Sequence, residues 1–518
     1  LLPSAICVSL PKKVKRTKSE TQRKRRKILN FRPLVIIALS QIIAIIFARY
    51  TPDLGVWARI IPFLIIGFGF TLYFLIFRKS NKFLVGSTAI ASLLLTFFGG
   101  FAIENSVNKV KIGACESGDY MVEGVINYVS YFDGRYNYRL IECTVDGRNT
   151  GNIALYGIEE KYDVCDVVEF DAFVYGANSV TDGKYSDYVM NGISSIAKPS
   201  GDIVKIGVKK SVKYSFRKFV NERLSSMSDT SKNIAVGMIC GDTAALEDNA
   251  DIYRTAGIAH VFAVSGMHVG LLCALLSLIM KPIPVKKAYK SIIVIFVLFT
   301  YSWVCGFSAS SLRAAIICSV YLIVGTAYEK KDSLSALAVA SITVLLMNSC
   351  DLFNAGFVLS FSLCLSLIVI SPAVAALIRG KSEKLKGSIG AIFAAQAVAM
   401  PLSVCYFGSF PLVSIVSNFV IVPVVVVCFF ACFIGLGLSL IIPPSIANFV
   451  ADNMLRGIDY FTGLLAKTKA AVTVFPSWAM VIYFIALSIA SDLVGANRKI
   501  KLLSAGTAIS LAFVMVLL

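Results

Sequence analysis

The first long apolar stretch of the chain reads PLVIIALSQIIAIIFAR and occupies residues 33–49. A helix rises about 1.5 Å per residue, so such a stretch covers most of the roughly 30 Å hydrocarbon core of a bilayer. Two comparable stretches follow at residues 57–77 and 83–103. We therefore expect three transmembrane helices within residues 33–103, and we assign the chain to the class of polytopic α-helical membrane proteins.

The composition of the chain supports this class. Hydrophobic residues make up 57% and charged residues 16% of the chain, whereas soluble proteins carry about 25% charged residues. Residues 116–198 contain 14 acidic and 6 basic residues, so the net charge of +19 divides into −8 there and +27 elsewhere. Because Lys and Arg favour the cytoplasmic side of a membrane, we interpret this excess as a topology signal. The basic residues 1–32 are then cytoplasmic, and the chain emerges outside after residue 103.

Residues 104–210 differ in character from the apolar stretches. Alternating apolar and polar residues are punctuated by Asp-Gly pairs that are typical of tight hairpins, at Asp133-Gly134, Asp146-Gly147 and Asp182-Gly183. Five or six short strands of this kind predict a small extracellular β-barrel inserted after the third helix, with an OB-like fold as one candidate.

The cysteines and histidines limit which metal sites and disulfides the chain can form. Cys115, Cys143 and Cys165 lie in the extracellular segment, so we predict a disulfide between two of them and leave the pair open. The 13 cysteines show no zinc-type spacing, and His260 and His268 are the 2 histidines. We therefore expect no metal site and no cofactor.

Residues 211–256 are expected to form amphipathic or interfacial helices. The segment SVKYSFRKFVNERLSS, at residues 211–226, is basic and amphipathic. Binding to lipid head groups is the favoured interpretation. Contact with DNA through Lys209, Lys210 and Arg217 is the alternative.

Residues 257–518 return to membrane-length apolar stretches. We expect one long kinked helix or two half-helices at 411–441, an amphipathic segment at 446–466, and nine or more crossings in all. The other predicted spans are 258–280, 289–305, 308–327, 333–349, 355–371, 388–406, 477–491 and 502–518.

Polar residues inside these spans are the candidate functional groups. His260 and His268 are eight positions apart in one predicted span, about 80° from each other around a helix, and share a face with Ser265. Arg313 follows a run of small residues that includes Ser310. Polar groups at membrane depth usually face a bundle interior or a water-filled path. Histidines satisfied by hydrogen bonds between helices, and an arginine that snorkels to the outer boundary, are the alternatives.

Catalysis is not expected from these residues. Ser265 lacks a G-x-S-x-G setting and an acidic residue that would orient His268 as a base. The chain also lacks a G-x-x-x-x-G-K-[ST] phosphate loop, so energy for any driven process must come from a partner or a gradient.

The run GDTAALEDNADIYRTAGIAHVFAVSGMHVGLL, at residues 241–272, resembles the signature of the ComEC competence family. That signature contains a Gly-rich turn, a Phe/Tyr-Arg pair and a Gly-x-x-His-x-x-x-x-Ser-Gly-x-His motif. Its positions fall on Gly241, Tyr253-Arg254, Gly257, His260, Ser265-Gly266 and His268. Residues 306–314, the GFVLSF run at 356–361, and residues 411–423 with Ser417-Asn418 extend the resemblance over nearly the whole chain.

The resemblance implies a channel, in residues 257–518, for uptake of single-stranded DNA across the bacterial cytoplasmic membrane. The residues expected to line its path are Arg254, His260, Ser265, Gly266, His268, Ser310, Arg313, Gln396 and Asn418. The implied partners are single-stranded DNA, membrane lipids, a competence DNA receptor, a cytoplasmic helicase-like ATPase and a separate nuclease.

Two features depart from the family pattern. Many members carry a metallo-β-lactamase-like domain that two histidines cannot furnish, so we expect a short form or a fragment. The barrel segment is acidic, although Arg135, Arg139, Tyr136 and Tyr138 interleave charge and aromatic rings as candidate DNA contacts.

Two rival functions stay open. A secondary transporter of a small or anionic solute would also use broken helices and intramembrane histidines. An intramembrane hydrolase built on Ser265 is the less favoured alternative.

Overall fold

A computed structural model describes residues 33–51, 57–76, 82–176, 188, 191–246, 249–262, 266–306, 309–327, 332–378, 382–468, 471–490, 504 and 507–508. Within these residues, six helices are long and apolar enough to cross a membrane. They cover residues 33–50, 86–112, 287–304, 355–376, 383–407 and 414–438. The chain is therefore a multi-pass helical membrane protein that also carries a β-barrel, as the sequence predicts.

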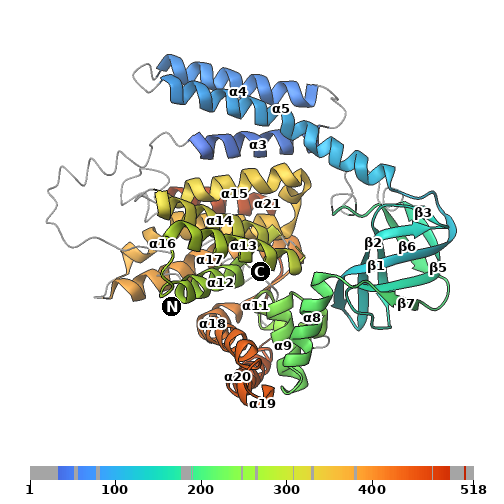
Figure 1. The fold of residues 1–518 in the computed structure, drawn as a ribbon. Coiled ribbons are helices and arrows are strands. Elements are labelled where there is room, and N and C mark those ends of the chain that lie inside the picture. The colour runs from blue at the N-terminus through green and yellow to red at the C-terminus, as the bar shows by residue number, and fades with distance from the viewer. Residues whose placement is uncertain are drawn as a thin grey trace.

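The N-terminal helices form a layer on one side of the molecule (Figure 1). They are α3 (Pro33–Tyr50), α4 (Trp57–Ile76) and α5 (Lys82–Ile112). The structure extends α5 beyond the predicted end at residue 103. Its 31 residues span about 46 Å, which is more than the hydrocarbon core requires, and its last turns lead to the barrel.

The barrel follows α5 directly. Its strands are β1 (Gly118–Phe132), β2 (Arg135–Val145), β3 (Arg148–Asn149), β4 (Ile153–Ile158), β5 (Asp166–Gly176), β6 (Ser195–Pro199) and β7 (Val204–Val208). Five of them close in the order β1-β2-β4-β6-β5, because β5 pairs back to β1. The β4–β6 pairing is parallel, and the other pairings in this circuit are antiparallel.

The hairpin turns of the barrel are the ones that the Asp-Gly pairs predict. Asp133 and Gly134 have φ values of 51° and 77° and connect β1 to β2. Asp146 and Gly147 do the same between β2 and β3, with φ values of 48° and 75°. Two successive positive φ values define a turn that matches the twist of paired strands. The third predicted pair, at residues 182–183, lies outside the described residues.

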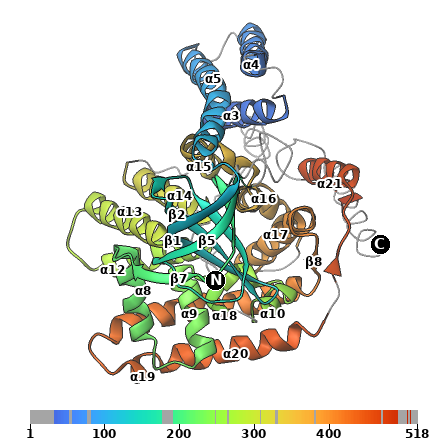
Figure 2. The same ribbon diagram turned by 90° about the vertical axis from the view of Figure 1, so that its right-hand side faces the viewer.

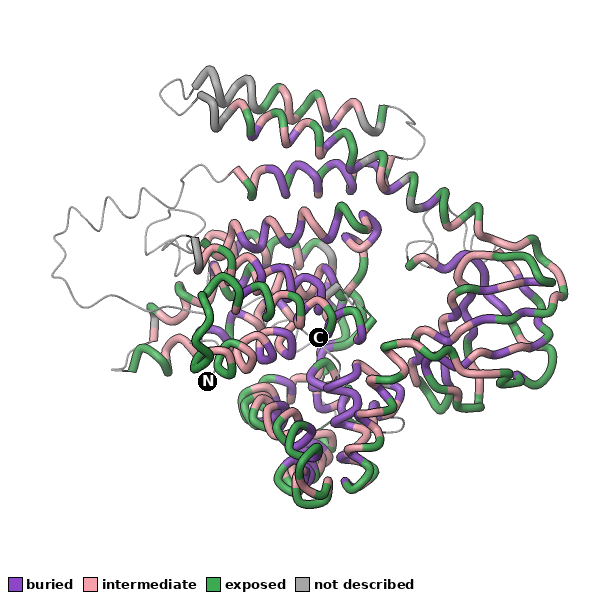
Figure 3. The backbone as a smooth tube through the Cα atoms, viewed as in Figure 1, coloured by how far each residue is buried: buried purple, intermediate pink, exposed green. Residues whose placement is uncertain are grey.

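Short helices connect the barrel to the helical bundle. They are α8 (Val212–Arg223), α9 (Asp229–Cys240), η2 (Thr243–Leu246), α10 (Asn249–Thr255) and α11 (Ala259–Phe262). Their buried apolar residues, including Ile234, Met238 and Tyr253, form one core with residues of α18 and α20. Figure 3 shows buried positions concentrated in α9 and α11 and on the inner face of the barrel.

The bundle contains the remaining elements of the chain. They are α12 (Gly266–Met280), α13 (Lys287–Val304), α14 (Ala309–Ala327), α15 (Ser333–Met347), η3 (Ser349–Phe353), α16 (Ala355–Leu377), α17 (Glu383–Phe407), β8 (Phe410–Pro411), α18 (Ser414–Leu438), α19 (Pro444–Ala447), α20 (Phe449–Leu465), β9 (Ala471–Val472) and α21 (Ser477–Ala490).

The span predicted at 258–280 is instead two helices, α11 and α12. Residues 414–438 form one helix with Pro423 inside it, which decides between the two predicted alternatives. The span predicted at 502–518 falls almost entirely outside the described residues.

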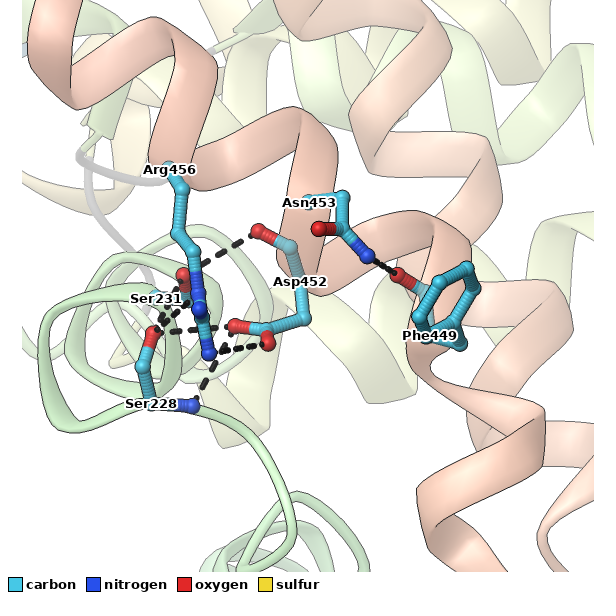
Figure 4. A network of polar contacts seen from close by, with 6 residues as sticks. All are labelled: Ser228, Ser231, Phe449, Asp452, Asn453 and Arg456. Carbon is cyan, nitrogen blue, oxygen red and sulfur yellow. Dashed lines mark hydrogen bonds and ion pairs between the residues drawn. The ribbon is translucent and has the colours of Figure 1, made fainter.

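The α18 and α20 helices run steeply across the others. They are seen nearly end-on in Figure 1 and lengthwise in Figure 2, whereas α12 to α17 show the opposite views. Helix α20 is held against α9 by Asp452, which accepts hydrogen bonds from the backbone and hydroxyl of Ser228 at 3.2 and 2.9 Å. Arg456 adds an ion pair at 2.8 Å (Figure 4). Burial acts to raise the pKa of Asp452, yet hydrogen bonds from Ser231, Ser228 and Arg456 hold that pKa below its ordinary value.

Candidate functional site in the helical bundle

Three bundle helices bring small and polar residues together at one place. The backbone N–H of Gly266, at the start of α12, donates a hydrogen bond to the Ser310 hydroxyl of α14 at 2.9 Å. The same hydroxyl lies 3.4 Å from the Ser360 hydroxyl of α16. We call Gly266, Ser310, Arg313 and Ser360 the serine–arginine cluster. It joins three stretches that are separate in the sequence.

Arg313 is the charged member of this cluster. Its Nη2 donates a hydrogen bond to Ser310 Oγ at 3.2 Å, and its guanidinium carbon lies 5.1 Å from the centre of the Phe361 ring. The residue is only 4% exposed, and its Nε and Nη1 atoms have no hydrogen-bond partner among the described residues. A buried cation is costly unless an anion compensates it. The cluster therefore encloses two unused donors of the kind that bind anions.

The close approach of α12 to α14 explains the glycine in this cluster. A Cβ atom at position 266 would lie 2.8 Å from Arg313 Nη2 and 3.4 Å from both Ala314 Cβ and the Ser310 carbonyl oxygen. Any larger side chain would occupy the space of the guanidinium. Gly266 thus fixes where the charge of Arg313 lies.

The two histidines do not share one helix face, contrary to the sequence prediction. His260 is in α11 and His268 is in α12, and residues 263–265, with Ser265, lie outside the described residues. His268 is fully buried, with its ring 4.9 Å from that of Phe429 in α18. The His260 side chain is exposed. The two histidines therefore belong to two successive helices, α11 and α12.

Two further predicted residues of the path lie on neighbouring helices. Asn418 is on α18, and Gln396 is on α17. Asn418 Oδ1 and Gln396 Oε1 are buried and lack hydrogen-bond partners among the described residues. Ser414, one turn before Asn418, packs against Gly257, where a Cβ atom would lie 2.2 Å from the Ser414 Cβ. This contact places the start of α18 against the segment that precedes α11.

Comparison with known proteins agrees with this arrangement of motifs. A family profile described as "Competence protein" matches residues 238–493, which include every member of the serine–arginine cluster. The chain belongs to the ComEC family. ComE operon protein 3 of Bacillus subtilis (strain 168) is 26% identical over 358 residues, a match covering 64% of this chain and 44% of that relative. The chain thus spans less than half the length of this relative. No solved structure matches it.

The Tyr-Arg pair of the ComEC signature joins the barrel to the bundle. Tyr253 donates a hydrogen bond to Asp459 Oδ1 of α20 at 2.6 Å. Arg254 forms an ion pair with Asp251 at 2.6 Å, donates to the Tyr131 carbonyl at 3.2 Å and lies 5.2 Å from the Phe132 ring centre. A place for Arg254 on the DNA path stays a prediction. Its side chain reaches the β1–β2 hairpin.

Two aromatic residues of the barrel are also misassigned by the sequence. Tyr136 and Tyr138 are 7% and 2% exposed because they occupy the inward positions of β2. Tyr138 donates to the Glu160 carbonyl at 2.6 Å and accepts from the Tyr162 N–H at 2.9 Å. These rings cannot stack on DNA bases. Arg135 and Arg139 occupy the outward positions, and their contact with DNA stays a prediction.

The basic residues around α8 have separate roles. Arg217 is 8% exposed and forms an ion pair and hydrogen bond with Asp242, so its guanidinium is engaged within the protein. Lys209 pairs with Glu142, and Lys210 is exposed. Contact of these two lysines with DNA stays a prediction.

The predicted disulfide is absent from the structure. Cys115, Cys143 and Cys165 are free thiols. Cys143 and Cys165 are 1% and 6% exposed within the barrel core, where a thiol packs as a small apolar group. Burial raises the pKa of Cys143 to about 12, which keeps the thiol protonated and unreactive.

Some residues of the site were not identified from the sequence. Ser360 lies in the GFVLSF run that carries the family resemblance, and its position in an apolar helix was the available signal. Asp242 and Asp459 are partners of Arg217 and Tyr253 across long sequence separations. Nothing local in the sequence identifies such pairs.

Proposed function

We propose that the chain forms the conduit through which single-stranded DNA crosses the bacterial cytoplasmic membrane during natural transformation. The N-terminus would be cytoplasmic, and the barrel, with its OB-like circuit of five strands, would lie outside. Membership of the ComEC family supports this role. The basic excess outside residues 116–198 supports the orientation.

The serine–arginine cluster is the observation that carries the proposal. Arg313 is a cation at bundle depth, and no carboxylate among the described residues neutralises it. A transiting DNA strand supplies one phosphate anion per nucleotide, which fits the free Nε and Nη1 donors. Arginine suits this task because its planar fork binds phosphate oxygens and stays charged at every physiological pH.

The neighbouring residues would set the position of the passing phosphate. Ser310 accepts hydrogen bonds from both the Gly266 N–H and Arg313, so it holds the guanidinium at the start of α12. Ser360 contributes a second hydroxyl from α16. His260 is exposed on α11, and we propose that its imidazole lines the water-filled path. As the strand moves, successive phosphate groups would bind in turn at the hydroxyl groups of Ser310 and Ser360, and these weak, uncharged contacts would let each phosphate leave again.

Partners would supply what this chain does not. We propose that a competence DNA receptor delivers the strand and that a cytoplasmic helicase-like ATPase pulls it, because the sequence contains no phosphate-binding loop of its own. A separate nuclease would remove the other strand. We propose no catalytic role for this chain.

Uptake of labelled DNA tests the conduit. In a competent host that relies on this chain, Arg313→Gln should lower uptake of labelled DNA by at least about tenfold, which corresponds to roughly 1.4 kcal/mol of lost anion binding. Arg313→Lys should retain part of the uptake because it keeps the charge but not the fork. Lys384→Gln, which removes an exposed cation from the first turn of α17, is the matched control and should be neutral.

The outcome also separates the rival function. Unchanged transformation in Arg313→Gln cells, at normal protein level in the membrane, would overturn the conduit. If the same cells lost flux of a small anion while still taking up DNA, the chain would be a secondary transporter.

A further inference from the structure

A cleft of about 500 Å³ lies between the barrel and the helices α8 and α9. The barrel supplies residues of β1, β2 and the β4–β5 connection, and the helices supply the opposite wall. We call it the seam cleft. It is lined by Val129, Tyr136, Lys161, Tyr162, Asp163, Val164, Tyr214, Arg217, Lys218, Asn221, Glu222, Lys232, Asn233, Val236, Asp242, Ala244 and Ala245.

The charges of the seam cleft divide into a fixed pair and an outer group. Arg217 and Asp242 pair with each other, with side chains only 10% and 12% exposed, and hold α8 against the turn that follows α9. Lys218 lies 3.9 Å from Glu222. Lys161, which also has an interaction of its own, Lys232 and Asp163 complete the charged lining. The lining carries four basic and three acidic side chains, in contrast to the net −8 of residues 116–198.

The uncharged groups of the cleft narrow the chemistry of a ligand. Asn221 and Asn233 offer amide donors and acceptors from α8 and α9. Tyr162 and Tyr214 are partly exposed and offer ring faces, since the Tyr162 hydroxyl is already bound to the Ile203 carbonyl at 2.6 Å. Amines for phosphates, rings for base stacking and amides for base edges are the groups that single-stranded nucleic acids use. The aliphatic part of the lining consists of short Val and Ala side chains.

The cleft also lies next to the route into the bundle. Its wall α9 packs against α11, because a Cβ atom on Gly237 would lie 2.8 Å from the Phe262 carbonyl oxygen. The α9 backbone accepts a hydrogen bond from Tyr301 of α13 at 3.3 Å, at the Met238 carbonyl. A strand held in the seam cleft is therefore one helix away from the segment that leads to α12 and the serine–arginine cluster.

We infer that the seam cleft binds a segment of single-stranded DNA and passes it from the barrel side to the bundle. This inference rests on the proposed function and assigns it a loading site distinct from Arg313. Lys161, Lys218 and Lys232 contact phosphates, Tyr162 and Tyr214 stack on bases, and the Arg217–Asp242 pair keeps the two walls in register.

Binding of a fluorescent oligothymidylate to the full chain in zwitterionic nanodiscs, followed by anisotropy, tests the cleft. The variant Lys161→Gln/Lys232→Gln should weaken binding by about tenfold or more at low salt. It should also reduce the slope of log K against log salt by about 1.4, as expected for two lost phosphate contacts on a single strand. The control Lys111→Gln/Lys198→Gln removes two exposed lysines outside the cleft and should leave affinity and slope unchanged.

A second measurement uses the unmodified protein, so it does not depend on the folding of a variant. Photo-crosslinking to an oligonucleotide that carries 5-iodo-deoxyuridine should give adducts on Tyr162 or Tyr214, identified by mass spectrometry. Adducts confined to other residues would overturn the assignment. Equal affinities of the cleft and control variants would do the same.

The outcomes separate this inference from the proposed function. If Arg313→Gln abolishes uptake while the cleft variant binds DNA normally, the conduit stands and the cleft assignment fails. If the cleft variant loses binding while Arg313→Gln cells transform normally, the cleft stands and the conduit fails. Binding of anionic phosphatidylglycerol vesicles that depends on the two lysines, with no effect on the oligonucleotide, would make the cleft a lipid site and overturn the inference.

Discussion

Tyr253 and Asp459 are joined by a 2.6 Å hydrogen bond across 206 residues of sequence. Tyr253 is fully buried, and its ring packs 4.5 Å from that of Phe262. The next residue, Arg254, points the other way and contacts the β1–β2 hairpin. Two adjacent side chains thus link α10 to α20 on one side and to the barrel on the other. This explains why a tyrosine and an arginine are needed side by side.

Tyr253→Phe should lower the free energy of unfolding by about 1.5–3 kcal/mol, because it removes a hydrogen bond to a charged acceptor. Asp459→Asn keeps an acceptor for the hydroxyl and should cost less. Thermal unfolding in detergent measures both. A Tyr253→Phe protein that melts at the wild-type temperature would show that this hydrogen bond does not stabilise the fold.

Gly266→Ala should impair uptake without unfolding the protein. The one contact of the new methyl group under 3 Å is with Arg313 Nη2, the end of a flexible side chain, at 2.8 Å. The guanidinium should therefore move while the backbone stays. We expect about tenfold lower uptake of labelled DNA, equivalent to roughly 1.4 kcal/mol of misplaced anion binding.

Gly270→Ala is the matched control for that change. It lies one turn further along α12, and no atom lies within 4 Å of its added Cβ. Alanine is also the better helix former. Equal uptake defects in the two variants would mean that helix α12 responds to alanine in general and not through Arg313.

Local patterns predicted the parts of this fold that depend on local chemistry. The Asp133-Gly134 turn follows from two residues that accept positive φ, and the ends of α13 and α17 follow from long apolar stretches. The inward direction of Tyr136 and Tyr138 was also present in the alternation with Arg135 and Arg139. The arginines next to these tyrosines favoured a different interpretation, in which the rings stack on DNA bases.

Other parts required tertiary information. The structure places His260 on α11 and His268 on α12, although the sequence around them reads as one apolar span. The pairing of Arg217 with Asp242 depends on how α8 packs against α9. Within the serine–arginine cluster, Gly266, Ser310 and Arg313 are candidates from the sequence and Ser360 is not. Only the packing of α12, α14 and α16 brings the cluster together.

Gly390→Ala should destabilise the pair of helices α16 and α17. A Cβ atom at position 390 would lie 2.7 Å from the Ser371 carbonyl oxygen and 3.1 Å from Ala375 Cβ. Both are rigid neighbours, so the helices must separate, at a cost of about 1–3 kcal/mol. Gly387→Ala, one turn earlier with no atom within 4 Å, should be neutral or stabilising. Melting temperatures in detergent compare the two, and similar values would contradict the close packing.

Asp351 should make the stability of the junction between α15 and α16 depend on pH. Burial raises the pKa of Asp351 from 3.8 to about 6, against the opposing effect of the hydrogen bond from Asn348 at 2.7 Å. A raised carboxyl pKa means that the folded state prefers the protonated form. Its stabilising contribution is complete below pH 3.8 and is lost as the pH rises through about 6.

Asp351→Asn mimics the protonated form and keeps an oxygen that accepts from Asn348. The variant should therefore melt at a higher temperature than the wild type at pH 7, and the difference should vanish near pH 4. The neighbouring contact of Arg49 with the Phe353 ring, 4.1 Å from the guanidinium carbon, ties this junction to α3, so the whole N-terminal layer should follow the same titration. A constant offset between the two proteins from pH 4 to pH 8 would show that Asp351 is not the titrating group.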